Sequence, residues 1–465
     1  MIFSSLTFLT YFLPLALALY YLSPKKFKNS LLLFISFFFY AWGEPIYILL
    51  MLISACADYK LGLKIEKERT SNGNPRFFLS LSLLFNIGLL CVFKYSDFII
   101  SLINNWIGTE IPFLHLPLPI GISFYTFQTM SYSIDLYRGK VKAQKNLLDF
   151  ALYVSLFPQL IAGPIVRYES IASEIKERRH SMSLFSEGAF QFIIGLSKKV
   201  LIANNVGQLW TALLAGDFGE LSTFAAWFGI IAFSLQIYFD FSGYSDMAIG
   251  LGKMFGFHFP QNFNYPYLAL SLSDFWRRWH MTLGGWFRDY VYFPLGGSRK
   301  EHFVVVRNLF VVWFLTGLWH GASWNYIVWG LYFGVLIGCE KLFLTAFLKK
   351  LPTYIQRIYA LFFIVIGWIL FYFEKSEQGL PFLKTLFGLD GSPFFVGRDI
   401  YLLYSYGLIC MIAVTASTPI GKYIASISYI QKNSWPPFLF CLILFILSLA
   451  YLTDQTYNPF LYFRF

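Results

Sequence analysis

The stretch RNLFVVWFLTGLWHGASWNYIVWGLYFGVLIGCE, residues 307–340, decides the fold class of this 465-residue chain. The 32 residues between its charged ends carry no formal charge if His320 is neutral, and as one helix they would extend over ~48 Å. A hydrocarbon core is only about 30 Å thick. Because Gly317 and Gly321 flank His320, we predict two membrane helices that meet at a break near GLWHGAS.

The remainder of the chain has the same apolar character. Hydrophobic residues make up 57% of it and charged residues 13%, whereas soluble domains carry about 25% charged residues. Apolar runs at residues 3–22, 222–239, 358–373 and 436–452 approach or reach the roughly 20 residues that cross a membrane. We count about ten to twelve such segments and predict an all-α, polytopic integral membrane protein.

Glycine, proline or polar residues interrupt three apolar stretches in the middle of the chain, at residues 116–135, 155–168 and 238–250. Non-helical backbone at membrane depth is tolerated only where protein or a water-filled cavity satisfies it. We therefore expect helix breaks or re-entrant segments here, around an enclosed chamber formed mainly by residues 116–340. The sequence shows no long linker or internal repeat, so residues 1–465 are predicted to form a single domain.

The formal net charge of +11 lies mostly in short loops between apolar segments. Such a distribution follows the positive-inside rule and attraction to anionic lipids, and it gives no reason to expect a nucleic-acid partner. We expect the basic loops at residues 64–76 and 138–145 to be cytoplasmic and residues 104–119 to be external. The five scattered cysteines are interpreted as buried apolar residues, because no pair has the spacing of a disulfide framework or metal site.

A second stretch, SDFWRRWHMTLGGWFRDYVYFPLGGSRK at residues 273–300, is far more polar than its surroundings. If residues 272–290 form one helix, Asp274 can pair with the arginines three and four positions later, and most of the aromatic residues share one face. Such a helix could lie at the membrane interface with a structural role. His280 stands beside the aromatic face and is a candidate functional residue.

His320 lies 13 residues past Arg307, which is ~20 Å along a helix and well inside the membrane. An ionisable residue at that depth is a functional candidate, and a neutral imidazole is a good proton acceptor near pH 7. The alternative is a core histidine that is hydrogen-bonded to Ser323 or Thr316.

Two further polar pairs lie between residues 236 and 267. Asp240 and Asp246 could bind a cation or relay protons, but no third ligand has metal-binding spacing. We interpret them as hydrogen-bonding support for the chamber and predict no metal site. Asn262 and Asn264 are interpreted as turn residues.

The stretches FWRRWHMTLGGWFRDYVYFPLGG (275–297) and RNLFVVWFLTGLWHGASWNYIVWG (307–330) together closely resemble the membrane-bound O-acyltransferase family, in its bacterial branch that acts on alginate and teichoic acids. The segments MIFSSLTFL, GPIVRY, YFDFSGYSDMAIG and NPFLYFRF resemble the alginate-type members. By position, His320 matches the family's catalytic histidine and His280 its second polar position. The resemblance also implies a ring of helices, with re-entrant or interfacial segments, around a central funnel or tunnel. We expect substrate contacts from Asp274, Arg277, Trp319 and Asn325.

The activity that the resemblance implies is acyl transfer to a hydroxyl group. The donor would be acetyl-CoA or another acyl thioester, with no bound cofactor. The acceptor would be an extracytoplasmic polysaccharide such as an alginate-like exopolysaccharide, reached directly or through a periplasmic acetyltransferase- or esterase-like partner. The protein would lie among the lipids of the bacterial inner (cytoplasmic) membrane.

Three alternatives differ from this interpretation. The first is D-alanyl transfer to teichoic acid-like polymers within the same family. The second is a transporter or flippase, because buried His, Asp and Arg beside broken helices are also typical of that class. The third is a membrane scaffold without chemistry. Neither of the last two explains why WRRWH and GLWHG occur together.

Overall fold

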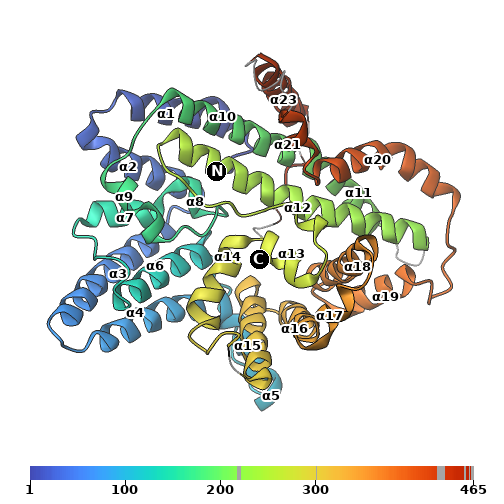
Figure 1. Ribbon diagram of the computed structural model, residues 1–465, viewed down its shortest axis with the longest axis horizontal. Helices are drawn as coiled ribbons and strands as arrows, with labels where there is room; N and C mark the ends of the chain where they lie inside the picture. Colours follow the sequence, from blue (N-terminus) through green and yellow to red (C-terminus); the bar gives the residue numbers. More distant parts are fainter. Residues whose placement is uncertain (217–220, 300, 427–434, 455–456, 460, 462–465) are drawn as a thin grey trace. The chain divides into compact units, whose positions relative to one another are not determined.

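A computed structural model describes residues 1–216, 221–299, 301–426, 435–454, 457–459 and 461. Within these ranges all regular secondary structure is helical (Figure 1), which confirms the all-α prediction. Seven helices of the described chain are long and apolar enough to cross a membrane. They cover Pro75–Ile107, Thr223–Met254, His302–His320, Trp324–Leu348, Thr353–Tyr372, Gly397–Ala416 and Trp435–Asp454. The protein is therefore a multi-pass membrane protein.

Residue contacts divide the chain into two compact units that alternate along the sequence. One contains residues 1–192 and 245–260, and the other contains residues 193–244 and 261–465. The long helix α12 (Thr223–Met254) contributes residues to both units.

The first unit consists of short and long helices, some joined by short turns and others by longer non-helical segments such as residues 108–121. Helix α4 continues through a π-helical turn, Cys91–Tyr95, into α5, so that one span of 33 residues results. The helices of this unit are α1 (Leu13–Leu22), α2 (Lys28–Ala41), α3 (Tyr47–Thr70), α4 (Pro75–Leu90), α5 (Ser96–Ile107), α6 (Ile122–Tyr137), α7 (Leu147–Ser155), α8 (Phe157–Leu160), α9 (Tyr168–Lys176) and most of α10 (Met182–Ser197).

A buried polar network joins three helices of the first unit. The Asp58 carboxylate on α3 accepts hydrogen bonds from the Ser82 hydroxyl (2.6 Å) and from the Asn86 amide nitrogen (2.9 Å), both on α4. Thr129 on α6 donates its hydroxyl to the Asn86 side-chain oxygen at 2.8 Å. All four residues are fully buried. Because these buried polar groups satisfy one another, the network fixes how the three helices pack.

Two of the three expected helix interruptions are present. Helix α6 begins only at Ile122, after Gly121 in a left-handed conformation with φ 78°. Residues 161–167 form no helix although nearly all are buried. Tyr153 supports this segment, because its hydroxyl donates to the carbonyl of Val166 at 3.2 Å.

The expected break at residues 238–250 is wrong, because α12 is helical from Thr223 to Met254. Gly243 instead marks a place where another stretch of backbone comes close. A Cβ atom at Gly243 would lie 2.7 Å from the carbonyl oxygen of Gly195. The glycine therefore allows close packing and does not end the helix.

The second unit contains the helix pair predicted from residues 307–340. Helices α15 (His302–His320) and α16 (Trp324–Cys339) lie side by side (Figure 1) and are separated only by residues 321–323, so the predicted break is confirmed. A Cβ atom at Gly317 would collide with the carbonyl of Tyr326. The other helices of this unit are α11 (Asn204–Leu214), α13 (Leu272–Arg278), α14 (Met281–Phe287), α17 (Thr345–Leu348), α18 (Thr353–Tyr372), α19 (Ser376–Leu386), α20 (Gly397–Ala416), α21 (Ile420–Ala425) and α23 (Trp435–Asp454).

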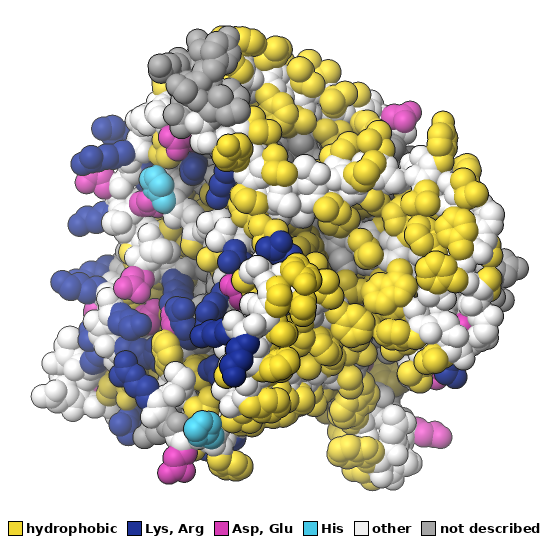
Figure 2. Space-filling model, turned by 45° about the vertical axis from the view of Figure 1, so that its right-hand side comes forward, with side chains coloured by type: hydrophobic (Ala, Val, Ile, Leu, Met, Phe, Trp, Pro, Cys, Tyr) yellow, Lys and Arg dark blue, Asp and Glu magenta, His cyan; other side chains and the backbone are white. Residues whose placement is uncertain are grey.

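Large apolar side chains cover much of the surface shown in Figure 2, whereas Lys and Arg side chains gather in one part of it. On α20, Tyr404 is 88% exposed and Leu408 is 67% exposed, and on α23 Phe438 is 69% exposed. Soluble monomers rarely leave such patches in water. These faces are suited to contact lipid chains.

Candidate functional site

His320 is the last residue of α15, and its side chain is buried in the second unit with 6% exposure. The helix ends there because Gly321 is extended, and α16 begins three residues later at Trp324. Thr316, one expected partner of a structural histidine, donates its hydroxyl to the carbonyl of Val312 at 2.7 Å. The helix break thus places a buried imidazole between two membrane-length helices.

Aromatic rings surround the His320 imidazole. Its ring centroid lies 5.0 Å from Trp329 on α16, 5.3 Å from Phe371 on α18 and 5.1 Å from its neighbour Trp319. Each of these rings stands nearly perpendicular to the imidazole. The edges and faces of these rings fix the orientation of the imidazole, since a rotation would collide with them.

A narrow pocket of about 20 Å³ lies beside His320. This space is large enough for about one water molecule. Its lining is almost entirely apolar, and His320 and Asp240 are its ionisable members. The lining residues are Ile237, Asp240, Phe241, Trp279, His320, Trp329, Trp368, Phe371 and Leu461.

The negative charge of Asp240 is balanced at the pocket, because Asp240 forms an ion pair with Lys199. The Lys199 ammonium lies 2.6 Å from one Asp240 oxygen, and both side chains are at most 3% exposed. Asp246 lies in the first unit, where it accepts a hydrogen bond from Gln191 at 3.2 Å. Six residues apart on one continuous helix, Asp240 and Asp246 point in different directions. Both therefore have supporting contacts, as expected.

His280 occupies the junction of two helices and is 2% exposed. The expected single helix over residues 272–290 is wrong, because α13 ends at Arg278 and α14 starts at Met281. At the junction His280 adopts a left-handed conformation with φ 44° and ψ 52°. Few residues other than glycine adopt this conformation, and such strain persists only where surrounding contacts enforce it.

Asn262 provides these contacts, although the sequence suggested only a turn residue. Its side-chain oxygen lies 3.2 Å from His280 Nδ1, and it accepts hydrogen bonds from the Thr282 hydroxyl (2.9 Å) and backbone N–H (3.2 Å). Its own carbonyl accepts from the backbone N–H of Met281 at 2.9 Å. Asn262 thus holds His280 and the start of α14, and it orients the imidazole.

One ring, that of Trp319, contacts both histidines. Trp319 lies 5.9 Å from the His280 ring and 5.1 Å from the His320 ring, measured between centroids. Phe241, which lines the pocket, lies 4.7 Å from His280. His320 therefore borders the pocket, and His280 stands behind Phe241 and Trp319.

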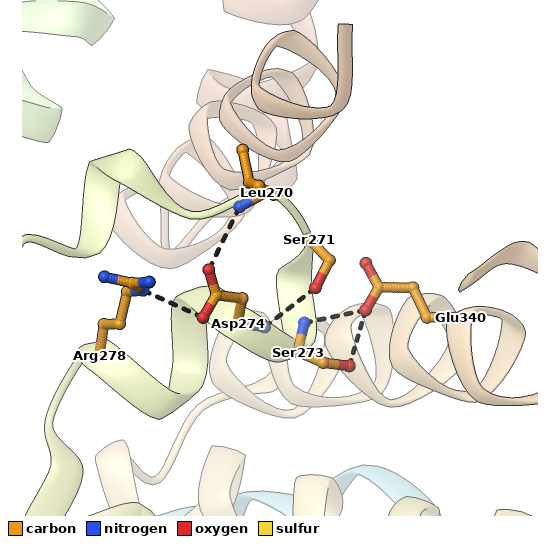
Figure 3. A network of polar contacts seen from close by, with 6 residues as sticks. All are labelled: Leu270, Ser271, Ser273, Asp274, Arg278 and Glu340. Atoms are coloured by element: carbon orange, nitrogen blue, oxygen red, sulfur yellow. Dashed lines mark hydrogen bonds and ion pairs between the residues drawn. The ribbon is translucent and has the colours of Figure 1, made fainter. Parts of the chain in front are cut away.

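The other expected substrate-binding residues lie in different places. Asp274 accepts hydrogen bonds from Arg278 (3.0 Å) and from the backbone of Leu270 (3.3 Å), at the start of α13 (Figure 3). Arg277 is exposed. Asn325 donates to the carbonyl of Phe371 at 3.2 Å. The structure therefore brings His320 to the pocket, with Trp319 beside it. Asn325 supports the pocket wall at Phe371, whereas Asp274 and Arg277 lie on α13.

Glu340 is a further buried residue that the sequence analysis did not select. Its carboxylate accepts hydrogen bonds from the backbone N–H groups of Leu272 (2.7 Å) and Ser273 (2.9 Å) and from the Ser273 hydroxyl (2.6 Å), as Figure 3 shows in part. It caps α13, the helix that leads to His280. The sequence gives one sign of Glu340, which stands at the end of a long uncharged run. It gives a similar sign of Lys199, a charged residue within an apolar stretch.

Comparison with known proteins places this architecture in a family. The sequence profile of the membrane-bound O-acyltransferase family matches residues 19–376. A probable alginate O-acetylase of Azotobacter vinelandii is 37% identical over the full length of both chains. A peptidoglycan O-acetyltransferase of Helicobacter pylori is 36% identical over 84% of this chain and 80% of its own. A teichoic acid D-alanyltransferase of Bacillus subtilis is 30% identical over 53% of this chain and 67% of its own.

Proposed function

The chain belongs to the membrane-bound O-acyltransferase family, and we propose that it transfers acetyl groups from a cytoplasmic acyl thioester to hydroxyl groups of an extracytoplasmic polysaccharide. One observation carries the assignment of its chemistry. His320 is buried at a helix end, held among aromatic rings, and borders an apolar pocket in a membrane-embedded unit. His320 is the general base in this proposal.

The proposed step needs a base because a sugar hydroxyl is a poor nucleophile until its proton is removed. His320 takes this proton while the hydroxyl oxygen attacks the carbonyl carbon of the thioester. The new C–O ester bond forms, the C–S bond breaks, and the leaving thiolate receives the proton from His320. Apolar rings around the pocket keep water from competing with the hydroxyl for the acyl group.

In this proposal His280 has a polar supporting role. Asn262 lies beside Nδ1 of the imidazole, and the His280 ring packs against Phe241, which lines the pocket. A hydrogen bond from His280 to the acceptor or to the developing oxyanion would lower the barrier, and one such donor contributes ~3–4 kcal/mol in other enzymes.

An alginate-like or other envelope polysaccharide is the acceptor that the comparisons favour. The probable alginate O-acetylase of Azotobacter vinelandii matches 100% of this chain and the Helicobacter pylori peptidoglycan O-acetyltransferase 84%, whereas the Bacillus subtilis D-alanyltransferase matches 53%. D-alanyl transfer to teichoic acid-like polymers is therefore the less favoured alternative. Family membership also disfavours the transporter and scaffold alternatives.

The location of the two substrates requires a path across the membrane. Acyl thioesters such as acetyl-CoA are made in the cytoplasm, and a charged carrier does not diffuse through hydrocarbon. We propose a bacterial inner-membrane location, with lipids around the protein and a funnel or tunnel that leads to His320. Beside the seven long apolar helices, the described chain has one shorter apolar helix, Phe8–Leu22, and we propose about ten to twelve crossings in total. A periplasmic acetyltransferase- or esterase-like partner would pass the acetyl group to the polysaccharide where transfer is not direct.

The test compares acetyl esters on the envelope polysaccharide of cells that carry His320→Ala, His320→Gln or the unchanged protein. We expect either substitution to remove nearly all the acetate released by mild base, because no other group replaces the lost base. The loss of a general base typically costs about 10²–10⁴-fold in rate.

The matched control is His302→Gln, because His302 is an exposed residue at the opposite end of the same helix. This variant should keep the acetyl content of the unchanged protein. Membrane abundance of each variant must be equal by immunoblot. Normal acetyl content in either His320 variant would contradict the assignment.

A further inference from the structure

Residues 457–459 form a non-helical part of the second unit, and Leu461 belongs to the same unit. We refer to these four residues as the wall segment. The Leu461 side chain is 8% exposed and lines the same pocket as His320. The wall segment therefore completes one side of the candidate site, although it lies more than a hundred residues further along the chain than His320.

The backbone of the wall segment is bound by the Lys199–Asp240 ion pair. The N–H of Leu461 donates to one Asp240 oxygen at 2.8 Å, while Lys199 lies 2.6 Å from the other oxygen. Lys199 also donates to the carbonyl of Pro459. One cation and one anion thus satisfy a backbone acceptor and a backbone donor of the same short segment.

The Lys199–Asp240 pair is deeply buried, and the free energy needed to remove two charges from water can exceed the gain from pairing them. Stabilisation alone therefore does not explain the pair. Asp240 lies 17 residues after the start of α12 at Thr223, which is ~26 Å along the helix and near its middle. Both side chains are at most 3% exposed. Apolar residues of similar volume often stabilise a protein as well as a buried ion pair does. Ionisable residues at membrane depth are usually retained for function.

Non-helical backbone offers a specific reason for this pair. A segment without helical hydrogen bonds leaves N–H and C=O groups that lipid and apolar side chains cannot satisfy. Lys199 supplies the donor for Pro459, and Asp240 supplies the acceptor for Leu461. Polar contacts from α11 hold the start of the segment, through Asn204 with Asn458 (3.2 Å) and Thr211 with Tyr457 (2.9 Å).

We infer that Lys199 and Asp240 are positioning residues for acyl transfer, which act by holding the wall segment against the pocket beside His320. This inference rests on the proposed function. When the pair is absent, the pocket opens next to His320. Water then enters and the acyl group loses one of its apolar supports. Transfer to the hydroxyl acceptor falls relative to hydrolysis of the thioester.

The test measures access to the wall segment directly. Leu461→Cys is introduced into a protein whose five native cysteines are replaced by alanine, and its reaction rate with N-ethylmaleimide is followed in detergent. The double substitution Lys199→Met with Asp240→Leu removes both charges and leaves no unpaired ion. We expect labelling of the cysteine to become about tenfold faster or more, because two charge-assisted hydrogen bonds are lost.

Two further variants separate positioning from general stability. Lys199→Arg preserves the ion pair and should keep labelling slow and transfer within about threefold of the unchanged protein. Asp399→Asn is the matched control. Asp399 is an equally buried carboxylate of the same unit that accepts from Ser222 at 2.7 Å and is not among the pocket residues. This control should leave the labelling rate unchanged.

The double variant should also lose acetyl transfer and show a higher ratio of thioester hydrolysis to transfer. Unchanged labelling in the double variant would overturn the inference. The inference would also be overturned if Asp399→Asn accelerated the labelling of the cysteine as much as the double substitution does. It would be overturned too if the double variant were labelled faster but kept full transfer activity. The labelling arm needs no substrate. If the unchanged protein showed no acetyl transfer while the labelling rates were as expected, the proposed function would be contradicted. The anchoring of the wall segment would not.

Discussion

Among single residues, His280 and His320 differ in the local structure that holds each imidazole in place. His320 results from a local helix end at Gly321. His280 requires a strained left-handed backbone that contacts from Asn262 maintain. Strain that a structure enforces at a buried polar residue is a common feature of functional sites. We therefore expect substitutions at the two positions to have different effects.

Substitutions at His280 should have graded effects. Asparagine adopts left-handed conformations more readily than most residues and keeps a polar side chain. We expect His280→Ala to lower the transfer rate by about 10²-fold and His280→Asn to lower it less. The measurement is the initial rate of acetyl transfer in isolated membranes. Wild-type rates in both variants would mean that His280 has only a structural role.

Asn262→Ala should also reduce transfer, because Thr282 and His280 lose a shared partner. Removing a buried hydrogen-bond partner costs about 1–3 kcal/mol, so a reduction of roughly tenfold or more is expected. The matched control is Asn264→Ala, since Asn264 contacts Arg278 through its backbone N–H, at 2.9 Å. Equal rates in the two variants would contradict the positioning role of Asn262.

The sequence predicts the helix break at His320 but not the contacts of Asn262, for a physical reason. A neutral run on both sides of His320 sets its membrane depth, and flanking glycines indicate a break. Asn262 acquires its role only when a loop folds back on residues 280–282. Local patterns do not encode this long-range contact. Lys199 was missed for the same reason, since its partners are on α12 and the wall segment.

At the scale of elements, a carboxylate from one helix stabilises the start of another. Glu340 directly follows α16 and is fully buried, and it binds the first backbone N–H groups of α13. Negative charge at a helix N-terminus is favourable because the unpaired N–H groups point toward it. The position of α13 determines where the chain turns into the His280 junction.

Glu340→Gln should therefore destabilise the protein and reduce transfer. The amide keeps the side-chain size but removes the charge and one acceptor. We expect a loss of about 1–2 kcal/mol in the free energy of unfolding, measured by denaturation in detergent. Glu374→Gln, at an exposed position just after α18, is the control and should have no effect. Equal free energies of unfolding for Glu340→Gln and Glu374→Gln would show that the Glu340 cap contributes little to stability.

The helix boundaries show which features can be predicted from local sequence. The break between α15 and α16 follows from glycines in an apolar run that is too long for one span. The interruption at His280 has no glycine or proline, and helical spacing therefore predicted one continuous helix. In α12 the glycines allow close backbone contact, as Gly243 and Gly195 do, and the helix continues. Glycine alone does not distinguish these two uses.

At the scale of the whole molecule, the orientation of the first unit tests the path of the donor. Ser71 and Glu110 are exposed residues near opposite ends of the 33-residue span Pro75–Ile107. A helix of that length extends ~50 Å and crosses the bilayer once. The basic residues near Ser71 predict a cytoplasmic position for that end.

Single cysteines at Ser71 and Glu110, in a variant without the native cysteines, report the orientation. In intact cells with a permeabilised outer envelope, an impermeant maleimide should label Glu110→Cys and leave Ser71→Cys unlabelled. Both should react after the cells are lysed, which serves as the control. The reverse pattern would place the basic loops outside and remove the basis for donor entry from the cytoplasm.

Composition and apolar runs predict the membrane class because they sum over many residues. The pocket could not be predicted in this way, since its walls come from α12, α15, α16, α18, the α13–α14 junction and the wall segment. No single stretch of sequence contains these residues together. The tertiary packing that produces the pocket was therefore visible only in the structure.

We propose that this protein transfers acetyl groups with His320 as the base. The most direct test of this assignment uses inverted membrane vesicles, which expose the cytoplasmic face to added [¹⁴C]acetyl-CoA and retain any periplasmic partner. The measurement is radioactive acetate released by mild base from the envelope polysaccharide. Vesicles with the unchanged protein should accumulate label, and His320→Gln should lower the initial rate by about 10²-fold or more. Equal rates in the two preparations would contradict the claim.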